Sequence, residues 1–339
     1  MHYSFLGSSG MRISQLVLGT ALFGVAPVEK DADALIGAAL DAGINAIDTA
    51  NAYGNLPHFD RPGIPPADQR KSAEEIIGAV LGGRRDDVIL STKASEPVGP
   101  GVNDRGLSRR HLFEQLDRSL ARLRTDHVDI FYAHHPDPNT PLEQTVAALD
   151  DLVRAGKTRS WALSTFPAWQ TMQALWISDQ RNLLTPVCLQ VRYSMVARQV
   201  ETEIVPVAKE FGLSLLVFSP LAGGLLAGLA VRERSWSGEK RWGGGAFTPS
   251  QLAAAEELDA LASEWGHDPA ELALAWVVSR PTVAGAIVGP ESPAELAASV
   301  AAIDVAASLE PAQLERLGEI GRTRVIEPQG RPAKPDAAG

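Results

Sequence analysis

The chain has 339 residues, and its 41 Asp and Glu outnumber its 31 Lys and Arg, which gives a formal net charge of −10. An acidic chain with dispersed basic residues lacks the clustered positive face that binds phosphates, so no nucleic-acid partner is expected. No stretch approaches the roughly 18 consecutive apolar residues of a membrane span, and the N-terminus lacks a secretory-signal pattern. The single cysteine, Cys188, cannot form an intramolecular disulfide. We therefore expect a cytoplasmic protein that does not associate with a membrane.

Short apolar runs rich in β-branched residues alternate with longer segments of helical period, which is typical of parallel βα units. Strands are expected at 16–20, 44–48, 88–92, 128–133, 159–163, 187–191, 215–219 and 284–288. Helices are expected at 31–42, 72–81, 108–123, 141–155, 168–178, 200–211, 269–279 and 293–302. Eight strands, each followed by a helix, predict an α/β fold of the (β/α)₈ or TIM-barrel type. Because no linker interrupts 16–302, we expect one domain over residues 1–327, followed by a disordered tail at 328–339.

Three segments exceed the minimal βα unit. Residues 3–15 are expected to form an N-terminal β-hairpin that plugs the bottom of the barrel. The Pro-rich stretch 54–70 is expected to be structureless, and the Gly-rich stretch 221–248 leads into an additional helix at 249–265. Long loops in a compact fold are usually functional or disordered. Both stretches follow the C-terminal ends of strands, which makes them candidate lids.

Polar or ionisable residues close six successive strands, and in a barrel enzyme these strand ends form the active site. No strand is followed by a dinucleotide-binding G-x-G-x-x-G, and neither a zinc-binding pattern nor a serine-hydrolase G-x-S-x-G occurs. His134 and His135 are neighbours on a predicted strand, so their side chains are expected to point to opposite sides. No metal site is therefore predicted.

Four spaced motifs carry a family resemblance. They are the segment from Asp48 to Gly54 (DTANAYG), Ser91-Thr92-Lys93, the segment from Val128 to His134 (VDIFYAH) and the segment from Leu221 to Leu226 (LAGGLL). In this order they resemble the aldo-keto reductase superfamily, in particular its longer bacterial members, from about residue 5 to residue 327. The resemblance implies an oxidoreductase that uses NAD(P)(H) to reduce an aldehyde or ketone to an alcohol, or to catalyse the reverse oxidation.

By the resemblance, the catalytic residues are Asp48, Tyr53, Lys93 and His134. Carbonyl reduction needs a proton donor at the developing alkoxide. A phenol has a pKa of about 10, so an ammonium beside Tyr53 is expected to favour its phenolate and ease proton release. Asp48 would hold Lys93 charged, and His134 would orient the substrate oxygen. His135 is expected to be a bystander.

The resemblance also places the contacts of a nicotinamide cofactor. Ser164, Thr165 and Gln190 would hold the carboxamide, and Thr165 stands where the family usually has Asn. A hydroxyl lacks the paired donor and acceptor of an amide, so this contact is expected to differ. Phe218 stands where an aromatic residue commonly stacks on the nicotinamide. Further contacts on this side of the site are expected at Gly19, Thr20, Ser219, Leu221 and Gly223.

The adenosine end departs further from the family pattern. The predicted contacts there are Gly289, Glu291, Glu295, Ser299 and, from the long loop, Arg241. A carboxylate repels a 2′-phosphate and can accept a hydrogen bond from a free ribose 2′-hydroxyl. NADP(H) is favoured because it is the more frequent cofactor of the family, and NAD(H) is the alternative.

Two other functions are weighed against the reductase. One is a nicotinamide-binding regulatory subunit that resembles the potassium-channel β subunits of the same superfamily, with slow redox chemistry. The other is a phosphate-binding barrel isomerase or lyase, which leaves the four candidate catalytic residues unexplained. The expected partner is a small-molecule carbonyl compound or alcohol. From its position after Tyr53, the insertion at 55–70 suggests a polar, sugar-like substrate, and no oligomeric state is predicted.

Overall fold

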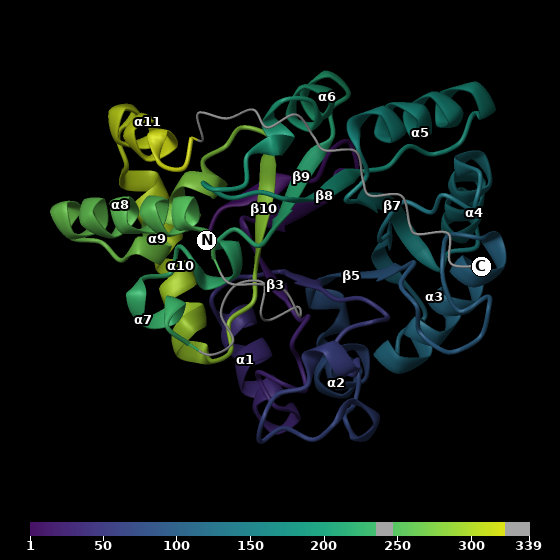
Figure 1. The fold of residues 1–339 in the computed structure, drawn as a ribbon. Helices are drawn as coiled ribbons and strands as arrows, with labels where there is room; N and C mark the ends of the chain where they lie inside the picture. The colour runs from purple at the N-terminus through teal and green to yellow at the C-terminus, as the bar shows by residue number, and fades with distance from the viewer. Residues whose placement is uncertain (235–246, 323–339) are drawn as a thin grey trace, which may run out of the picture.

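A closed barrel of parallel strands forms the centre of the computed structural model, which describes residues 1–234 and 247–322 (Figure 1). The strands are paired in the order β10-β3-β4-β5-β6-β7-β8-β9. They comprise β3 (Leu16–Gly19), β4 (Ala46–Asp48), β5 (Ile89–Ala94), β6 (Val128–Ala133), β7 (Thr158–Ser164), β8 (Cys188–Arg192), β9 (Ser214–Phe218) and β10 (Val283–Val288). All eight predicted strands are present, and the predicted barrel is confirmed.

Helices surround the barrel and cover the outer faces of its strands (Figure 1). Those that match predicted helices are α1 (Glu29–Asp41), α2 (Ala73–Leu81), α3 (Arg109–Leu123), α4 (Leu142–Arg154), α5 (Ala168–Arg181), α6 (Ile204–Glu210), α8 (Pro249–Trp265), α9 (Pro269–Val278) and α10 (Pro293–Ser308). The helix predicted at 200–211 is divided into a 3₁₀ turn, Gln199–Glu201, and α6. Side-chain caps fix where several of these helices begin. At the start of α2, for example, Ser72 and Glu75 form a reciprocal capping box.

Two helices were not predicted. The first, α7 (Leu229–Arg232), is a single turn that is too short to show a helical period. The second, α11 (Pro311–Glu319), begins with a capping box between Glu310 and Gln313 and with proline in its first turn. That pattern is a recognisable helix start, so the sequence did carry a signal for α11.

The N-terminal hairpin closes the bottom of the barrel. It consists of β1 (Tyr3–Phe5) and β2 (Arg12–Ser14), which pair antiparallel. Leu6 and Ile13 are buried and pack against side chains of the barrel interior, which include Val17, Ile130 and Leu216. The predicted plug is therefore confirmed, and apolar side chains fill this end of the barrel.

The segment 54–70 is ordered, contrary to the prediction that it is structureless. It contains two 3₁₀ turns, Pro57–Phe59 and Ala67–Gln69. The buried guanidinium of Arg70 organises it by donating to the backbone oxygens of Gly54, Leu56 and Pro65 at 2.6–3.1 Å, and it pairs with Asp60 at 2.6 Å. A single side chain can satisfy so many acceptors because guanidinium carries five N–H donors.

The remaining expectations concern membrane association, the C-terminal tail and the long loop at 221–248. Within residues 1–234 and 247–322, the helices fall short of the length and hydrophobicity that crossing a bilayer requires. The predicted disordered tail at 328–339 and the later part of the 221–248 loop lie outside the described residues.

The turn of the N-terminal hairpin gives a test of the plug. Gly7 and Gly10 both have positive φ, but a Cβ at Gly7 would lie 2.2 Å from the carbonyl oxygen of Val187, whereas one at Gly10 meets nothing within 4 Å. Gly10→Ala should lower the free energy of unfolding by about 1–2 kcal/mol, the usual cost of left-handed backbone. Gly7→Ala should cost at least about 3 kcal/mol because the clash is added. Urea unfolding measures both, and equal losses would contradict a tightly seated plug.

Candidate active site

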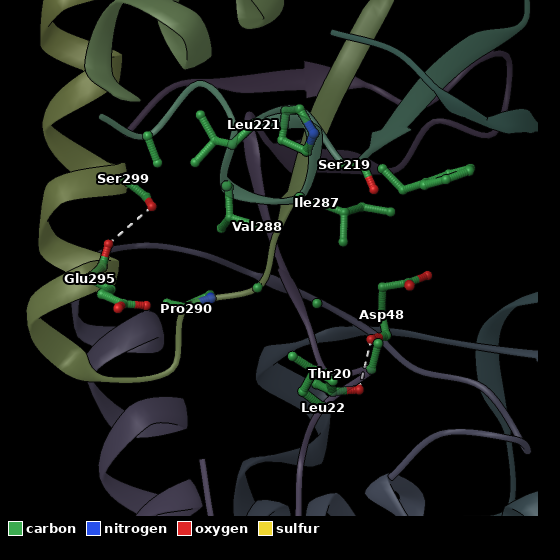
Figure 2. Close-up of a pocket in the computed structure, with 18 of the residues that line it drawn as sticks. Thr20, Leu22, Asp48, Ser219, Leu221, Ile287, Val288, Pro290, Glu295 and Ser299 are labelled. Carbon is green, nitrogen blue, oxygen red and sulfur yellow. Dashed lines mark hydrogen bonds between the residues drawn. The ribbon is translucent and has the colours of Figure 1, made fainter. Parts of the chain in front are cut away.

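A cavity of about 890 Å³ lies over the C-terminal ends of the barrel strands (Figure 2). Most of the predicted site residues line it together. They are Gly19, Thr20, Asp48, Tyr53, His134, Ser164, Thr165, Gln190, Phe218, Ser219, Leu221, Gly223, Gly289, Glu295 and Ser299. Lys93 lies below the cavity floor, Glu291 is not among the lining residues, and Arg241 lies outside the described residues.

An ion pair between Asp48 and Lys93 supports the floor of the cavity, which Asp48 lines and below which Lys93 is fully buried. Lys93 Nζ lies 2.5 Å from Asp48 Oδ2 and also donates to the carbonyl oxygen of Thr49 at 2.8 Å. The other carboxylate oxygen accepts hydrogen bonds from Ser91 Oγ at 2.9 Å and Gln190 Nε2 at 2.8 Å. Burial lowers the pKa of Lys93, but the charge of Asp48 and the hydrogen bonds to Asp48 and Tyr53 more than offset this effect, so the pKa is raised. The ammonium therefore stays charged inside the barrel.

Tyr53 points its hydroxyl at this ion pair, and its Oη lies 3.2 Å from Lys93 Nζ. Burial raises the pKa of the phenol, and the neighbouring ammonium lowers it. Burial prevails, so the pKa lies above its ordinary value, whereas the sequence-based expectation named only the effect of Lys93. The raised pKa keeps the phenol protonated at neutral pH, which is the form that can donate a proton.

His134 stands beside Tyr53, with the two ring centroids 5.8 Å apart in an edge-on arrangement. Burial, together with the positive charge of Lys93, holds the pKa of His134 well below its usual range. The imidazole is therefore neutral at pH 7. Its Nδ1 is buried without a hydrogen-bond partner among the residues that the structure describes. A neutral imidazole carries one N–H donor, which is what orienting a carbonyl oxygen requires.

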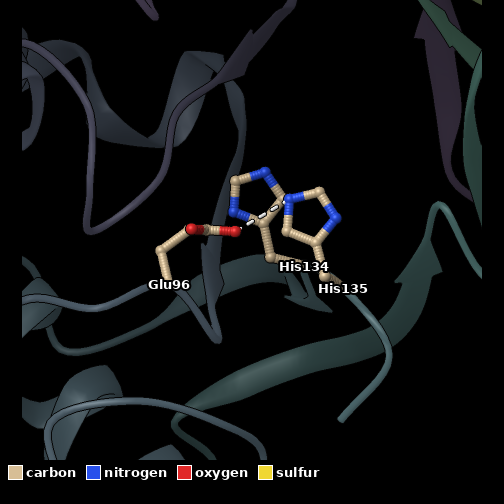
Figure 3. Close-up of side chains that lie close together, drawn as sticks. All are labelled: Glu96, His134 and His135. Atoms are coloured by element: carbon tan, nitrogen blue, oxygen red, sulfur yellow. Dashed lines mark ion pairs between the residues drawn. The ribbon is translucent and has the colours of Figure 1, made fainter. Parts of the chain in front are cut away.

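The orientation of His135 contradicts the prediction that its side chain points to the side opposite that of His134. The two rings stack with centroids 4.5 Å apart and planes 13° from parallel. The reason is that β6 ends at Ala133, so both residues follow the strand and its alternation no longer applies. His135 is also not isolated: its Nδ1 lies 2.7 Å from Thr165 Oγ1, and its Nε2 lies 2.9 Å from a carboxylate oxygen of Glu96 (Figure 3).

Glu96, His134 and His135 each bring one potential metal-binding atom within 4.8 Å of the others. In a zinc site the nitrogen lone pairs, which lie in the ring planes, must converge on one ion. Two nearly parallel stacked rings cannot achieve this without rotating. We therefore interpret Glu96 and His135 as a hydrogen-bonded pair at the cavity wall, with the ring of His134 stacked on that of His135.

The residues predicted to hold a nicotinamide fit that group. Ser164 is buried, and its Oγ has no hydrogen-bond partner within the described part of the chain. A buried unpaired hydroxyl is costly, and a carboxamide in the cavity would satisfy it. Thr165, Ser219 and Ala222 have φ of 60°, 53° and 50°, in the left-handed region that these residue types rarely adopt. Such strain concentrates at functional sites.

The adenosine end carries charge on both sides. Arg61 from the 54–70 segment pairs with Glu291 at 3.5 Å, and Arg234 pairs with Glu295 at 2.8 Å. Glu295 also accepts the backbone N–H of Glu291 at 2.9 Å. Ser299 donates its hydroxyl to the carbonyl oxygen of Glu295 within α10 (Figure 2). Glu291 and Glu295 are thus each paired with an arginine.

Sequence reasoning missed several residues of the cavity. Glu96 lies two residues beyond β5 and Arg192 is the last residue of β8, so both follow the strand-end rule that found the others. Leu56 and Phe59 bring apolar side chains from the 54–70 segment, whose polar Asp60 is paired with Arg70. That segment therefore contributes mainly an apolar wall. Which of its residues face the cavity depends on how the segment folds, and the sequence pattern does not show this.

The Aldo/keto reductase family matches residues 15–322 of the chain. The chain belongs to the aldo/keto reductase family. The resemblance noted from the four sequence motifs is thereby confirmed, and the closed barrel with its N-terminal hairpin is the fold expected of a member.

Curated relatives cover almost the whole chain. YrpG of Bacillus subtilis, described as an uncharacterized oxidoreductase, is 36% identical over 327 residues, which are 94% of this chain and 96% of that protein. Probable voltage-gated potassium channel β subunits from Oryza sativa and Arabidopsis thaliana are 34% and 33% identical. These alignments cover 96% and 97% of this chain and 98% and 99% of the relatives. The family and the Bacillus subtilis relative together support an oxidoreductase.

The buried ion pair can be tested by stability. Asp48→Asn or Lys93→Met alone should lower the free energy of unfolding by about 3–5 kcal/mol, because each leaves an uncompensated buried group. The double variant should lose clearly less than the sum. Lys71→Met, which removes a half-exposed ion pair with Glu29, is the matched control and should cost about 0–1 kcal/mol. Urea unfolding measures all four variants, and strictly additive losses for Asp48 and Lys93 would contradict the coupling.

Proposed function

We propose that the protein is a cytoplasmic NAD(P)(H)-dependent oxidoreductase that reduces an aldehyde or ketone to an alcohol, or catalyses the reverse oxidation. The observation that carries the proposal is the position of Tyr53, with its hydroxyl 3.2 Å from Lys93 Nζ on the floor of a large cavity and beside His134. Family membership and the oxidoreductase relative are consistent with this chemistry. The proposed partner is a small-molecule carbonyl compound.

The side chains divide the work of the reduction. A bound nicotinamide supplies the hydride for the carbonyl carbon. Tyr53 donates its hydroxyl proton to the carbonyl oxygen, and the ammonium of Lys93 stabilises the phenolate that remains. Asp48 keeps that ammonium charged and fixed. Neutral His134 donates a hydrogen bond to the substrate oxygen and thereby orients it. In the oxidation, the phenolate accepts the alcohol proton.

The cofactor would lie along the cavity from Tyr53 to Ser299. Ser164 and Gln190 would face the carboxamide, and Phe218 would cover the nicotinamide ring. Ser219, Leu221 and Gly223 would line the pyrophosphate, where backbone N–H groups can approach closely at glycine.

We propose NADP(H) as the preferred cofactor, with NAD(H) as the alternative. The ion pairs of Arg61 with Glu291 and of Arg234 with Glu295 neutralise the two carboxylates that would otherwise repel a 2′-phosphate. Arg234 also lines the cavity. If a ribose 2′-hydroxyl instead displaced an arginine from its partner, the freed carboxylate would accept a hydrogen bond from it, which would favour NAD(H).

A second candidate function is a nicotinamide-binding subunit of a larger assembly, with slow redox chemistry. The names of the plant relatives favour it. Turnover separates the two functions: the enzyme should oxidise NADPH many times per site with an excess of a carbonyl compound, whereas a regulatory subunit should stop near one equivalent.

The role of Tyr53 is tested by removing its hydroxyl. Tyr53→Phe should lower kcat for carbonyl reduction by about 10²- to 10⁴-fold, because only the proton donor is lost. Its Kd for NADPH, measured by quenching of Trp fluorescence, should hardly change. Tyr193→Phe is the control, since the hydroxyl of this buried phenol donates to Glu201 and the residue does not line the cavity. Full activity of Tyr53→Phe would remove the mechanism.

The adenosine end is tested by charge reversal at Glu291. Glu291→Arg should raise the ratio of Kd for NADH to Kd for NADPH by about tenfold, equivalent to about 1.4 kcal/mol, because a guanidinium attracts the 2′-phosphate. Glu291→Gln removes only the negative charge and should give a smaller shift. Both ratios come from titrations followed by Trp fluorescence, and an unchanged ratio in Glu291→Arg would show that this position does not sense the phosphate.

A further inference from the structure

Glu96 places a carboxylate next to the proposed reaction centre. It follows β5 and lines the cavity, and one of its oxygens lies within 4.8 Å of a ring nitrogen of His134 (Figure 3). Its side chain is 35% exposed, so it faces the cavity without being surrounded by bulk water. The catalytic role proposed for Tyr53, Lys93, Asp48 and His134 does not use it.

The carboxylate is held in place by a chain of contacts that ends on the backbone. His135 Nε2 lies 2.9 Å from Glu96 Oε1, and His135 Nδ1 lies 2.7 Å from Thr165 Oγ1. Thr165 Oγ1 in turn donates to the carbonyl oxygen of His134 at 3.2 Å. The backbone N–H of His135 donates to Ser95 Oγ at 3.1 Å. A group fixed in this way can select substrates, because it need not be ordered when a substrate binds.

The surroundings determine what this carboxylate can recognise. A carbonyl oxygen bound at Tyr53 and His134 would place the carbon next to the carbonyl within reach of Glu96, since a carboxylate oxygen of Glu96 lies within 4.8 Å of a ring nitrogen of His134. Leu22, Leu56 and Phe59 make another wall of the cavity apolar. A carboxylate accepts hydrogen bonds and never donates them, so it favours a hydroxyl at that carbon. An alkyl group there would desolvate the charge without compensation, and an anionic group would be repelled.

We propose that Glu96 makes this protein selective for 2-hydroxy carbonyl compounds over plain ketones and 2-oxo acids. The inference rests on the proposed reductase function and names its substrate class. The hydroxyl at the neighbouring carbon donates to Glu96 while the carbonyl oxygen faces Tyr53 and His134. A neutral hydroxyl is assigned in preference to an ammonium group, since Lys93 already places a positive charge beneath the reaction centre.

Four aromatic ketones that differ only beside the carbonyl provide the probes. They are 2-hydroxyacetophenone, its near-isostere propiophenone, the anion phenylglyoxylate and the cation 2-aminoacetophenone. The full-length protein should reduce the hydroxy ketone with a kcat/KM about 10- to 100-fold above that of propiophenone, the worth of one hydrogen bond to a charged group. The protein with NADP⁺ bound should also bind the hydroxy ketone with a lower Kd than propiophenone, as measured by Trp fluorescence.

Three variants separate charge from hydrogen bonding. Glu96→Leu should bring the ratio between the hydroxy ketone and propiophenone to about one, since no acceptor remains. Glu96→Gln keeps an acceptor but loses the charge, so it should retain part of that ratio and raise kcat/KM for phenylglyoxylate about tenfold. Glu271→Gln, at another part of the same cavity wall, is the control and should change neither ratio. Unchanged NADPH binding verifies that each variant is folded.

Each contrary result has its own meaning. Equal ratios in the wild type and Glu96→Leu, in both kcat/KM and Kd, would overturn the role of Glu96 and leave the reductase intact. A preference for phenylglyoxylate would assign the neighbouring contact to Arg192, which also lines the cavity. A preference for 2-aminoacetophenone would overturn the assignment of a hydroxyl. A protein that binds neither NADPH nor NADH would overturn the proposed function and this inference with it.

Discussion

The site depends on a lysine buried inside a barrel. Lys93 has no exposed surface, and an ammonium in such a place is stable only with a counter-charge close by. Asp48 supplies it from the neighbouring strand, because β4 and β5 pair in parallel and bring both residues to the same end of the barrel. Tyr53 and Gln190 then attach to this pair by hydrogen bonds. The position of the proposed proton donor is thus set by the pairing of strands.

Backbone strain is concentrated around the same cavity. Of the five described non-glycine residues with positive φ, Arg124 and Asn182 cap helices, where left-handed backbone is ordinary. Thr165 and Ser219 follow strands β7 and β9 and line the cavity, and Ala222 lies between the lining residues Leu221 and Gly223. Strain at such positions persists only where the surrounding fold over-determines it. The barrel's stability therefore supports unfavourable conformations at the place where a cofactor would be held.

The sequence predicts those features that depend on residues close together in the chain, and it does not predict those that depend on contacts between distant segments. Hydrophobic period and strand-end chemistry are local, so the barrel and the convergence of Asp48, Lys93 and His134 could be predicted. The orientation of His135 could not, because it depends on where β6 ends, and the alternation of side chains stops there. The cluster with Glu96 also escaped, since it joins loops that follow different strands. Glu96 is far in the sequence from the adjacent His134 and His135, and no motif links it to them.

The 54–70 segment is held together largely by its own contacts, so the apolar side chains that it adds to the cavity can change independently of the barrel. Arg70 binds backbone oxygens of Gly54, Leu56 and Pro65, so much of the segment's cohesion is internal to it. Leu56 and Phe59 reach the cavity from this self-supporting unit. Such a unit behaves as a cassette: another segment of similar length and with its own internal anchor could replace it. The apolar lining would then be exchanged while the barrel, and the chemistry at its strand ends, stayed the same.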